Sequence, residues 1–279
     1  MRELGYYNGR IGELSEMTVP MNDRACYFGD GVYDAQLSRN YHLFALDEHV
    51  DRFFNSARMI GIEMPLSKDE LKDLLNTLIK KLDTGDLFVY YQVTRGTAPR
   101  EHTFPKAKAN LWVLMSPRKV NEGKEPLRLI TAEDTRFFHC NIKTLNLLPS
   151  VIAAEKAKEA GCHECVLYRP GYRVTECAHS NVHILKDGTL ITAPLDNLIL
   201  PGIARAHLLR MCGKMGIPVR EEPYTLDDLM NADEIFVTSS SNLMTHALEA
   251  DGKKIGGKDP ETFEKLRSAL LDEFYTETD

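Results

Sequence analysis

Residues 137–148 read Phe-Phe-His-Cys-Asn-Ile-Lys-Thr-Leu-Asn-Leu-Leu, and Lys143 stands in the middle of this apolar stretch. Phenylalanines precede the lysine and leucines follow it, so we expect its amine to be partly removed from water. Burial of that kind lowers the pKa of a lysine and increases the share of uncharged, nucleophilic amine. Such an amine suits a Schiff base with a carbonyl compound. The alternative is a lysine whose ammonium reaches water along its own aliphatic chain, and the local pattern leaves both interpretations open.

On the N-terminal side of this stretch, strand and helix patterns alternate. Asn8 and Gly9, between two extended stretches, predict a tight hairpin. Ser67 followed by Glu70 forms a capping box that opens a helix. Further strands are expected at 32–38, 41–45, 87–94 and 110–115, and a further helix runs from an N-cap at Asp47 to a stop at Gly61. We therefore expect this half of the chain to fold as an α/β domain.

Residues 116–126 are the most polar stretch between the two halves, and prolines and a glycine break them, which is typical of a linker. Beyond them, strands are expected at 127–132, 165–169, 182–186, 189–193 and 234–238, and helices at 149–160, 203–215 and 260–275. The sequence thus predicts a two-domain α/β protein. We place the N-terminal domain at 1–117, the linker at 118–126 and the C-terminal domain at 127–279.

The composition argues against several classes of function. The 279 residues carry a net charge of −7, which speaks against a broad surface for nucleic acid or an anionic membrane. No apolar run is long enough to span a membrane, and the first residues resemble no signal peptide, so we expect a cytoplasmic protein. The six cysteines are scattered and predict no disulfide framework. Cys162 and Cys165 lack the second pair of ligands that a structural zinc site needs, and no metal is expected.

Three further places carry groups that bind anions. Pro201-Gly202 leads into the helix that begins at Ile203, where free backbone N–H groups attract phosphate. The turn at 238–242, Thr-Ser-Ser-Ser-Asn, offers N–H and hydroxyl donors. Arg100 and His102 lie on a polar loop after an apolar strand, and an arginine and an imidazole can both donate to one carboxylate. Each signal is weak by itself, because most glycine-led helix starts, serine turns and polar loops bind nothing.

Taken together and in order, several motifs resemble those of the fold-type IV pyridoxal-phosphate (PLP) enzymes, the class IV aminotransferases. The motifs are Asp-Arg-Ala-Cys-Tyr-Phe-Gly-Asp-Gly-Val-Tyr at 23–33, Glu-His-Val-Asp-Arg at 48–52, Gln-Val-Thr-Arg-Gly-Thr-Ala-Pro-Arg-Glu-His at 92–102, Asn-Ile-Lys-Thr-Leu-Asn-Leu-Leu at 141–148, Thr-Glu at 175–176 with Ser-Asn at 180–181, and Leu-Pro-Gly-Ile at 200–203. Within the family they are most similar to the D-amino acid aminotransferases. The resemblance implies an α/β fold with an N-terminal α/β sandwich and a C-terminal pseudo-barrel with flanking helices.

The resemblance also implies a role for each site residue. Lys143 would hold PLP as a Schiff base and move the proton of the substrate α-carbon, and Glu176 would keep the pyridine nitrogen protonated. Tyr33 would act beside them as a further catalytic group, and it would bind the substrate α-carboxylate together with Arg100 and His102. The remaining cofactor contacts would be Arg52, the N–H groups of Ile203 and Ala204, Ser239 and Ser240 at the phosphate, and Leu200 at the ring face. Members of the family are homodimers in which the clamp loop reaches the other subunit, so shared active sites are expected.

The chain also departs from the pattern of the D-specific enzymes. Cys-Ala-His-Ser at 177–180 stands where Gly-Ser-Ser-Ser is usual, and His139 stands where an arginine is usual, although Arg136 is kept. Ala204 replaces a hydroxyl residue, which would remove one hydrogen bond to the phosphate and weaken cofactor binding by about 1 kcal/mol. His183 occupies a position where the class pattern expects Phe or Tyr. These differences bear on substrate preference more than on the class of reaction.

The function predicted from this resemblance is PLP-dependent transamination of D-amino acids, in which D-alanine and 2-oxoglutarate give pyruvate and D-glutamate. One alternative is a branched-chain L-amino acid aminotransferase, whose carboxylate and side-chain sites are exchanged, and Arg100 with His102 speaks against it. Another is a PLP lyase of the aminodeoxychorismate lyase type, which this loop does not support. A non-enzymatic PLP-binding protein predicts loss of Lys143 or Glu176, and both are present. The expected partners are small-molecule amino acids and 2-oxo acids, with no nucleic acid and no membrane.

Overall fold

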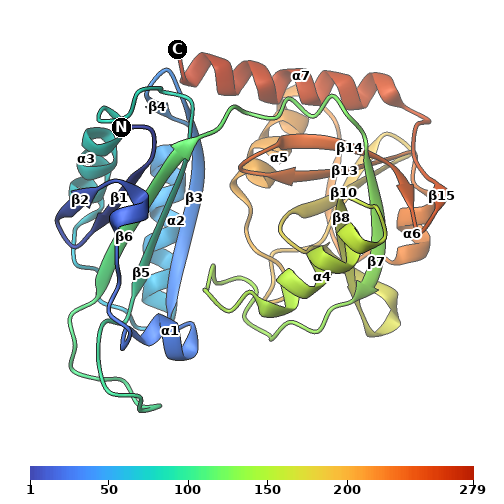
Figure 1. Cartoon of the computed structure of the whole chain (residues 1–279). Coiled ribbons are helices and arrows are strands. Elements are labelled where there is room, and N and C mark those ends of the chain that lie inside the picture. Colours follow the sequence, from blue (N-terminus) through green and yellow to red (C-terminus); the bar gives the residue numbers. More distant parts are fainter. The chain divides into compact units, whose positions relative to one another are not determined.

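The computed structural model describes residues 1–279 and contains two compact units (Figure 1). Unit 1 consists of Met1–Val120 together with Ile142–Asn146 and Phe274–Asp279. Unit 2 consists of Asn121–Asn141 and Leu147–Glu273. The chain therefore returns to unit 1 twice after its first 120 residues, and the first return carries Lys143.

Unit 1 is built on an antiparallel sheet with the strand order β2-β1-β6-β5-β3-β4. Its strands are β1 (Leu4–Tyr7), β2 (Arg10–Gly12), β3 (Gly31–Arg39), β4 (His42–Leu43), β5 (Leu87–Thr94) and β6 (Asn110–Pro117). The predicted hairpin between β1 and β2 is confirmed, because Tyr7 pairs with Arg10 and the two turn residues have positive φ, 45° at Asn8 and 96° at Gly9. A short 3-10 helix, η1 (Leu14–Glu16), follows β2.

Helix α2 (Leu46–Met59) packs on β3, α3 (Lys68–Ile79) packs against α2, and the short α1 (Arg24–Phe28) precedes β3. The capping box of Ser67 and Glu70 is confirmed at the start of α3. The expected N-cap of α2 is wrong: the cap is Ala45, with φ 52°, and Asp47 lies in the first turn, where it pairs with Lys72. The helix begins earlier because the backbone N–H of Ala45 already donates a hydrogen bond to the carboxylate of Glu277, near the C-terminus. Apolar side chains from both layers form one buried core.

Unit 2 contains a nine-stranded sheet with the order β12-β11-β10-β13-β14-β7-β8-β9, in which β15 also pairs with β14. Its strands are β7 (Leu127–Glu133), β8 (Glu164–Arg169), β9 (Arg173–Cys177), β10 (Asn181–Lys186), β11 (Thr189–Thr192), β12 (Val219–Glu221), β13 (Glu234–Ser239), β14 (Leu243–Ala250) and β15 (Lys253–Lys254), with a 3-10 helix, η2 (Pro170–Tyr172), before β9. The edge strand β9 meets the segment that follows β12 at the other edge: Val174 donates its backbone N–H to the carbonyl of Tyr224 at 2.9 Å. The sheet thus curls into a partial barrel.

Four helices accompany this sheet: α4 (Leu148–Glu159), α5 (Ile203–Met215), α6 (Leu226–Asn231) and α7 (Pro260–Glu277). Alanines of α4 pack on β8, and Leu229 of α6 lies in the core that fills the curled sheet. A third core joins α5 and α7 to β13. No helix combines the length and the hydropathy that a membrane crossing requires.

Candidate active site

Lys143 is held in unit 1 by its backbone. Its carbonyl accepts a hydrogen bond from the N–H of Tyr33 on β3 at 2.9 Å, and its own N–H donates to the Ser56 hydroxyl on α2 at 3.2 Å. The side chain is half-buried, and Nζ lies 4.3 Å from the centre of the Tyr33 ring. The amine forms no ion pair, so it is available to a ligand.

The apolar sequence neighbours expected to shield Lys143 do so only in part. Ile142 is buried, but Phe138 is 60% exposed and Leu148 is 69% exposed. Strand β3 and helix α2 also shield the lysine, because the segment around it pairs with the start of β3: Thr144 bridges to Val32. Tertiary contacts therefore add to the partial burial that the local sequence predicts.

Arg52 on α2 is buried against β3 in an ion pair with Asp34. Its Nε and Nη2 donate to the two carboxylate oxygens at 2.9 and 2.7 Å, and Nδ1 of His49 lies 2.7 Å from the same carboxylate. Burial by itself would raise the pKa of Asp34, but the charges of Arg52 and His49 hold it well below its usual range. Burial lowers the pKa of His49. Sequence reasoning missed Asp34 and His49; the only available signal was the i, i+3 spacing of His49 and Arg52 on one helix face.

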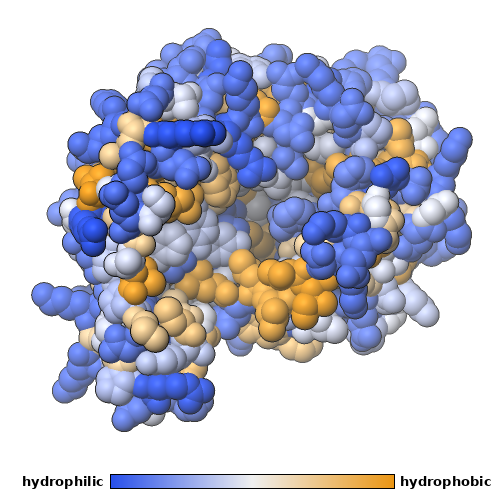
Figure 2. Space-filling model, viewed as in Figure 1, coloured by the Kyte–Doolittle hydropathy of each residue, from blue (hydrophilic) through white to orange (hydrophobic).

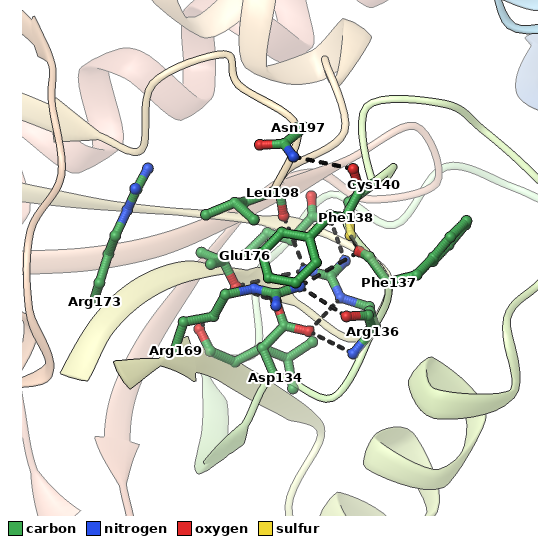
Figure 3. Close-up of polar contacts among 12 residues, drawn as sticks. Asp134, Arg136, Phe137, Phe138, Cys140, Arg169, Arg173, Glu176, Asn197 and Leu198 are labelled. Carbon is green, nitrogen blue, oxygen red and sulfur yellow. Dashed lines mark hydrogen bonds and ion pairs between the residues drawn. The ribbon is translucent and has the colours of Figure 1, made fainter. Parts of the chain in front are cut away.

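Glu176 on β9 is buried in unit 2, beside Arg136 (Figure 3). Oε2 accepts hydrogen bonds from the side-chain amide of Asn181 at 2.9 Å and from the N–H of Leu200 at 3.0 Å. Oε1 pairs with Nη1 of Arg136. Burial raises the pKa of Glu176, and the guanidinium of Arg136 opposes that rise.

Arg136 itself is fixed by a second carboxylate, that of Asp134 (Figure 3). Asp134 accepts from Nε and Nη2 of Arg136, each at 2.9 Å, and from the Thr175 hydroxyl at 2.9 Å. Nε of Arg169 lies 3.3 Å from the same carboxylate. Asp134 and Arg136 were not among the residues proposed for the site, because nothing in their local sequence shows that they meet Glu176.

The start of α5 leaves backbone donors free. Its N-cap is Gly202, and no side chain caps the first turn, so the N–H groups of Ile203 and Ala204 lack the usual cap. Glycine is needed at this N-cap: a Cβ on Gly202 would lie 2.0 Å from Oδ1 of Asn181, the residue that also holds Glu176. The helix start is therefore packed directly against the group that orients Glu176.

The serine turn follows β13. Ser239 ends the strand and Ser240 begins the turn, both are half-buried, and the hydroxyl of Ser239 lies 3.3 Å from that of Ser241. Ser239, Ser240, Ile203, Ala204, Leu200 and Glu176 all belong to unit 2, whereas Tyr33, Arg52, Arg100, His102 and Lys143 belong to unit 1.

The departures from the D-specific pattern have structural partners. His183 on β10 is completely buried, with its ring nitrogens 2.9 Å from the Thr192 hydroxyl and 2.8 Å from the Thr238 hydroxyl. Burial, together with the charge of Arg205, lowers the pKa of His183 to about 3, so the ring is neutral. His179 is mostly exposed and pairs with the buried carboxylate of Glu164.

Residues 31–249 match the sequence profile of the family described as amino-transferase class IV. The chain belongs to the class IV aminotransferases. It is 40% identical to a D-alanine aminotransferase of Bacillus licheniformis over 98% of this chain and 97% of the relative.

Two solved structures share the fold of this class IV aminotransferase. A branched-chain amino acid aminotransferase from T.th., complexed with N-(5'-phosphopyridoxyl)-L-glutamate, has 25% identity and a TM-score of 0.87 over 96% of this chain and 93% of that one. A putative 4-amino-4-deoxychorismate lyase from Legionella pneumophila has 25% identity and a TM-score of 0.86 over 93% and 97%. The predicted mixed α/β, fold-type IV architecture is confirmed. The fold by itself is compatible with three different reactions.

The groups of this aminotransferase fit PLP, the cofactor of its family. Glu176 is a buried carboxylate of the kind that pairs with a pyridinium nitrogen, and α5 begins with uncapped N–H groups of the kind that bind phosphate. Lys143 carries an amine without an ionic partner.

Proposed function

We propose that this chain is a PLP-dependent D-amino acid aminotransferase that converts D-alanine and 2-oxoglutarate to pyruvate and D-glutamate. The observation that carries the proposal is the 40% identity to a D-alanine aminotransferase over nearly the full length of both chains. Arg100 and His102 also support it. Both residues lie on one loop and their side chains contact the same aromatic ring. Their guanidinium and imidazole groups can both donate to one carboxylate.

Each protein group has one task in this reaction. When bound, PLP accepts the electrons of the bond broken at the substrate α-carbon. Nζ of Lys143 binds the cofactor and then takes the proton that leaves the α-carbon. Glu176, paired with Arg136, would hold a proton on the pyridine nitrogen. Tyr33 lies beside the Lys143 amine and orients it.

The groups proposed to bind the phosphate are one cationic side chain and several neutral hydrogen-bond donors. Arg52 supplies the guanidinium, and Asp34 fixes its orientation through two hydrogen bonds. The N–H groups of Ile203 and Ala204, with the hydroxyls of Ser239 and Ser240, supply neutral donors. Leu200 would pack against the cofactor ring. Arg100 and His102 bind the α-carboxylate of the amino acid and of the 2-oxo acid.

We further propose that the chain acts as a homodimer in the cytoplasm. Exposed apolar side chains cluster around the start of α4 in unit 2, where Figure 2 shows a hydrophobic patch; they are Phe137, Phe138, Leu147, Leu148, Val151 and Ile152. A patch of this kind is typical of a subunit interface. None of the six cysteines forms a disulfide, which suits a reducing compartment.

The test is a transamination assay on the purified holoenzyme with 2-oxoglutarate and either D-alanine or L-leucine. We expect D-alanine to be converted to pyruvate. The 2-oxoglutarate should be converted to the D enantiomer of glutamate. Turnover of L-leucine with formation of L-glutamate would instead support a branched-chain aminotransferase, whose fold this chain shares. No turnover of either amino acid with 2-oxoglutarate, together with release of pyruvate from 4-amino-4-deoxychorismate in a separate assay, would point to a lyase, whose fold this chain also shares.

A further inference from the structure

Phe28, the last residue of α1, lies against both side chains of the proposed carboxylate clamp. The guanidinium carbon of Arg100 lies 5.2 Å from the centre of the Phe28 ring. The His102 ring lies 5.2 Å from the same centre, tilted by 49°. Arg24 also faces this ring, with its guanidinium carbon 4.9 Å away. One aromatic ring therefore brings together the two residues that are expected to hold the substrate carboxylate.

The loop that carries the clamp is also held by its backbone. In Figure 1 the loop between β5 and β6 extends past the ends of these strands beside α1. Nη1 of the buried Arg24 donates to the carbonyl of Glu101 at 2.6 Å, at the one residue between Arg100 and His102. Nε of Arg24 donates to Asp30 at 2.7 Å, so the guanidinium has a fixed direction. The clamp side chains are exposed, but the backbone between them is fastened to α1.

Helix α1 is in turn fastened to the two strands from which the loop emerges. Asp23 caps α1 by accepting the N–H of Ala25 at 2.8 Å. Its second oxygen accepts from the Thr94 hydroxyl at the end of β5, at 2.9 Å, and from the Asn110 amide at the start of β6, at 2.8 Å. The ring of Phe28 therefore sits on a short helix whose position is set by the sheet.

We propose that Phe28 is a positioning residue for carboxylate binding, whose ring keeps the Arg100 guanidinium and the His102 imidazole together in the orientation that binds the substrate. The inference rests on the proposed function of that clamp. Phe28 itself touches neither substrate nor reacting atoms in this account. It acts by reducing the freedom of two exposed side chains that would otherwise sample many rotamers.

The test compares Phe28→Leu, Phe28→Tyr and Phe104→Leu in the holoenzyme. Phe28→Leu removes the π face and should raise the KM for D-alanine and for 2-oxoglutarate about five- to tenfold, with kcat within about twofold. Phe28→Tyr keeps an aromatic ring at this position, so both KM values should be close to those of the wild type. Phe104→Leu is the matched control, because that ring lies on the same loop but stacks on Arg95 at 3.5 Å, and it should leave KM unchanged.

A second readout does not depend on turnover. Propionate has the carboxylate but no amino group, and its dissociation constant for the holoenzyme can be measured by calorimetry. The dissociation constant of propionate should rise in Phe28→Leu by the same factor as KM. The midpoint temperature of thermal unfolding should be unchanged. In an Arg100→Ala background the effect of Phe28→Leu should shrink, because the two changes act on one contact.

The outcomes separate the two claims. Equal propionate affinity in wild type and Phe28→Leu, or a full additional effect in the Arg100→Ala background, would overturn the positioning role and leave the function standing. No turnover of D-alanine by wild type would overturn the proposed function, while weaker propionate binding in Phe28→Leu would still support the positioning role.

Discussion

At the scale of single residues, Arg136 is the side chain that opposes the effect of burial on the pKa of Glu176. Burial raises the pKa of Glu176, and the pairing with Arg136 is the main opposing influence. The carboxylate is useful beside a pyridine nitrogen only in its ionised form. Glu176 and Arg136 should therefore act together as one functional pair, although 40 positions separate them in the chain.

Replacing Arg136 with Gln should move the pH dependence of turnover. Without the guanidinium the pKa of Glu176 rises further, so the ionised form is lost at a higher pH as the solution is acidified. The acidic limb of the kcat profile should shift upward by at least about one pH unit, with kcat lowered even at pH 8. Arg173→Gln is the control, since Arg173 pairs with Asp196 and not with Glu176. An unchanged acidic limb in Arg136→Gln would contradict this role.

The buried pair of Asp34 and Arg52 should contribute to stability as well as to phosphate binding. Asp34→Asn leaves the Arg52 guanidinium buried without its counter-charge, which should lower the free energy of unfolding by about 3–5 kcal/mol. Asp47→Asn breaks an exposed pair with Lys72 and should lower it by less than about 1 kcal/mol. Urea unfolding measures the free energy of unfolding of both variants. Equal decreases in the two variants would show that Asp34 is not needed to balance the charge of the buried Arg52.

At the scale of helices and strands, His183 ties β10 to its neighbours β11 and β13 through two threonines. Its pKa in the folded state, about 3, lies below the ordinary value of 6.5. Between these two values the unfolded chain binds a proton that the folded chain does not. The free energy of unfolding should therefore fall as the pH drops below 6.5, by up to about 1.4 kcal/mol per pH unit from this group.

Unfolding free energies measured at pH 7, 6 and 5 test this, with His183→Phe as the comparison. The variant should lose this part of the pH dependence, whatever its stability at pH 7. If the free energy of unfolding changes with pH in the same way in the wild type and in His183→Phe, then His183 is protonated in the folded protein.

Elements with a local signal could be predicted from sequence, and contacts between distant segments could not. The capping box at Ser67 and the hairpin at Asn8 depend on neighbouring residues only, and the structure reproduces both. The shielding of Lys143 depends in part on β3, more than 100 residues earlier in the chain, and its sequence neighbours account for only some of it. Asp34 was missed for the same reason, and Arg136 was noted only as a retained arginine, without its partner Glu176.

At the scale of the whole molecule, the apolar patch around the start of α4 is the feature that predicts self-association. Leu148→Asp combined with Val151→Asp places two charges in this patch, where the side chains are 69% and 58% exposed. The variant should run as a monomer in light scattering at concentrations where wild type is a dimer. Met215→Asp, at an exposed apolar residue ending α5, is the control and should remain dimeric. A dimeric double variant would place the interface elsewhere.

The most direct test of D-amino acid transamination is a half-reaction followed by the absorbance of the bound cofactor, with D-alanine and L-leucine added separately and no 2-oxo acid present. D-alanine alone should convert the cofactor to its amine form with one equivalent of pyruvate, and Lys143→Ala should not respond. Conversion by L-leucine alone would contradict D-amino acid transamination and would require a different role for Arg100 and His102.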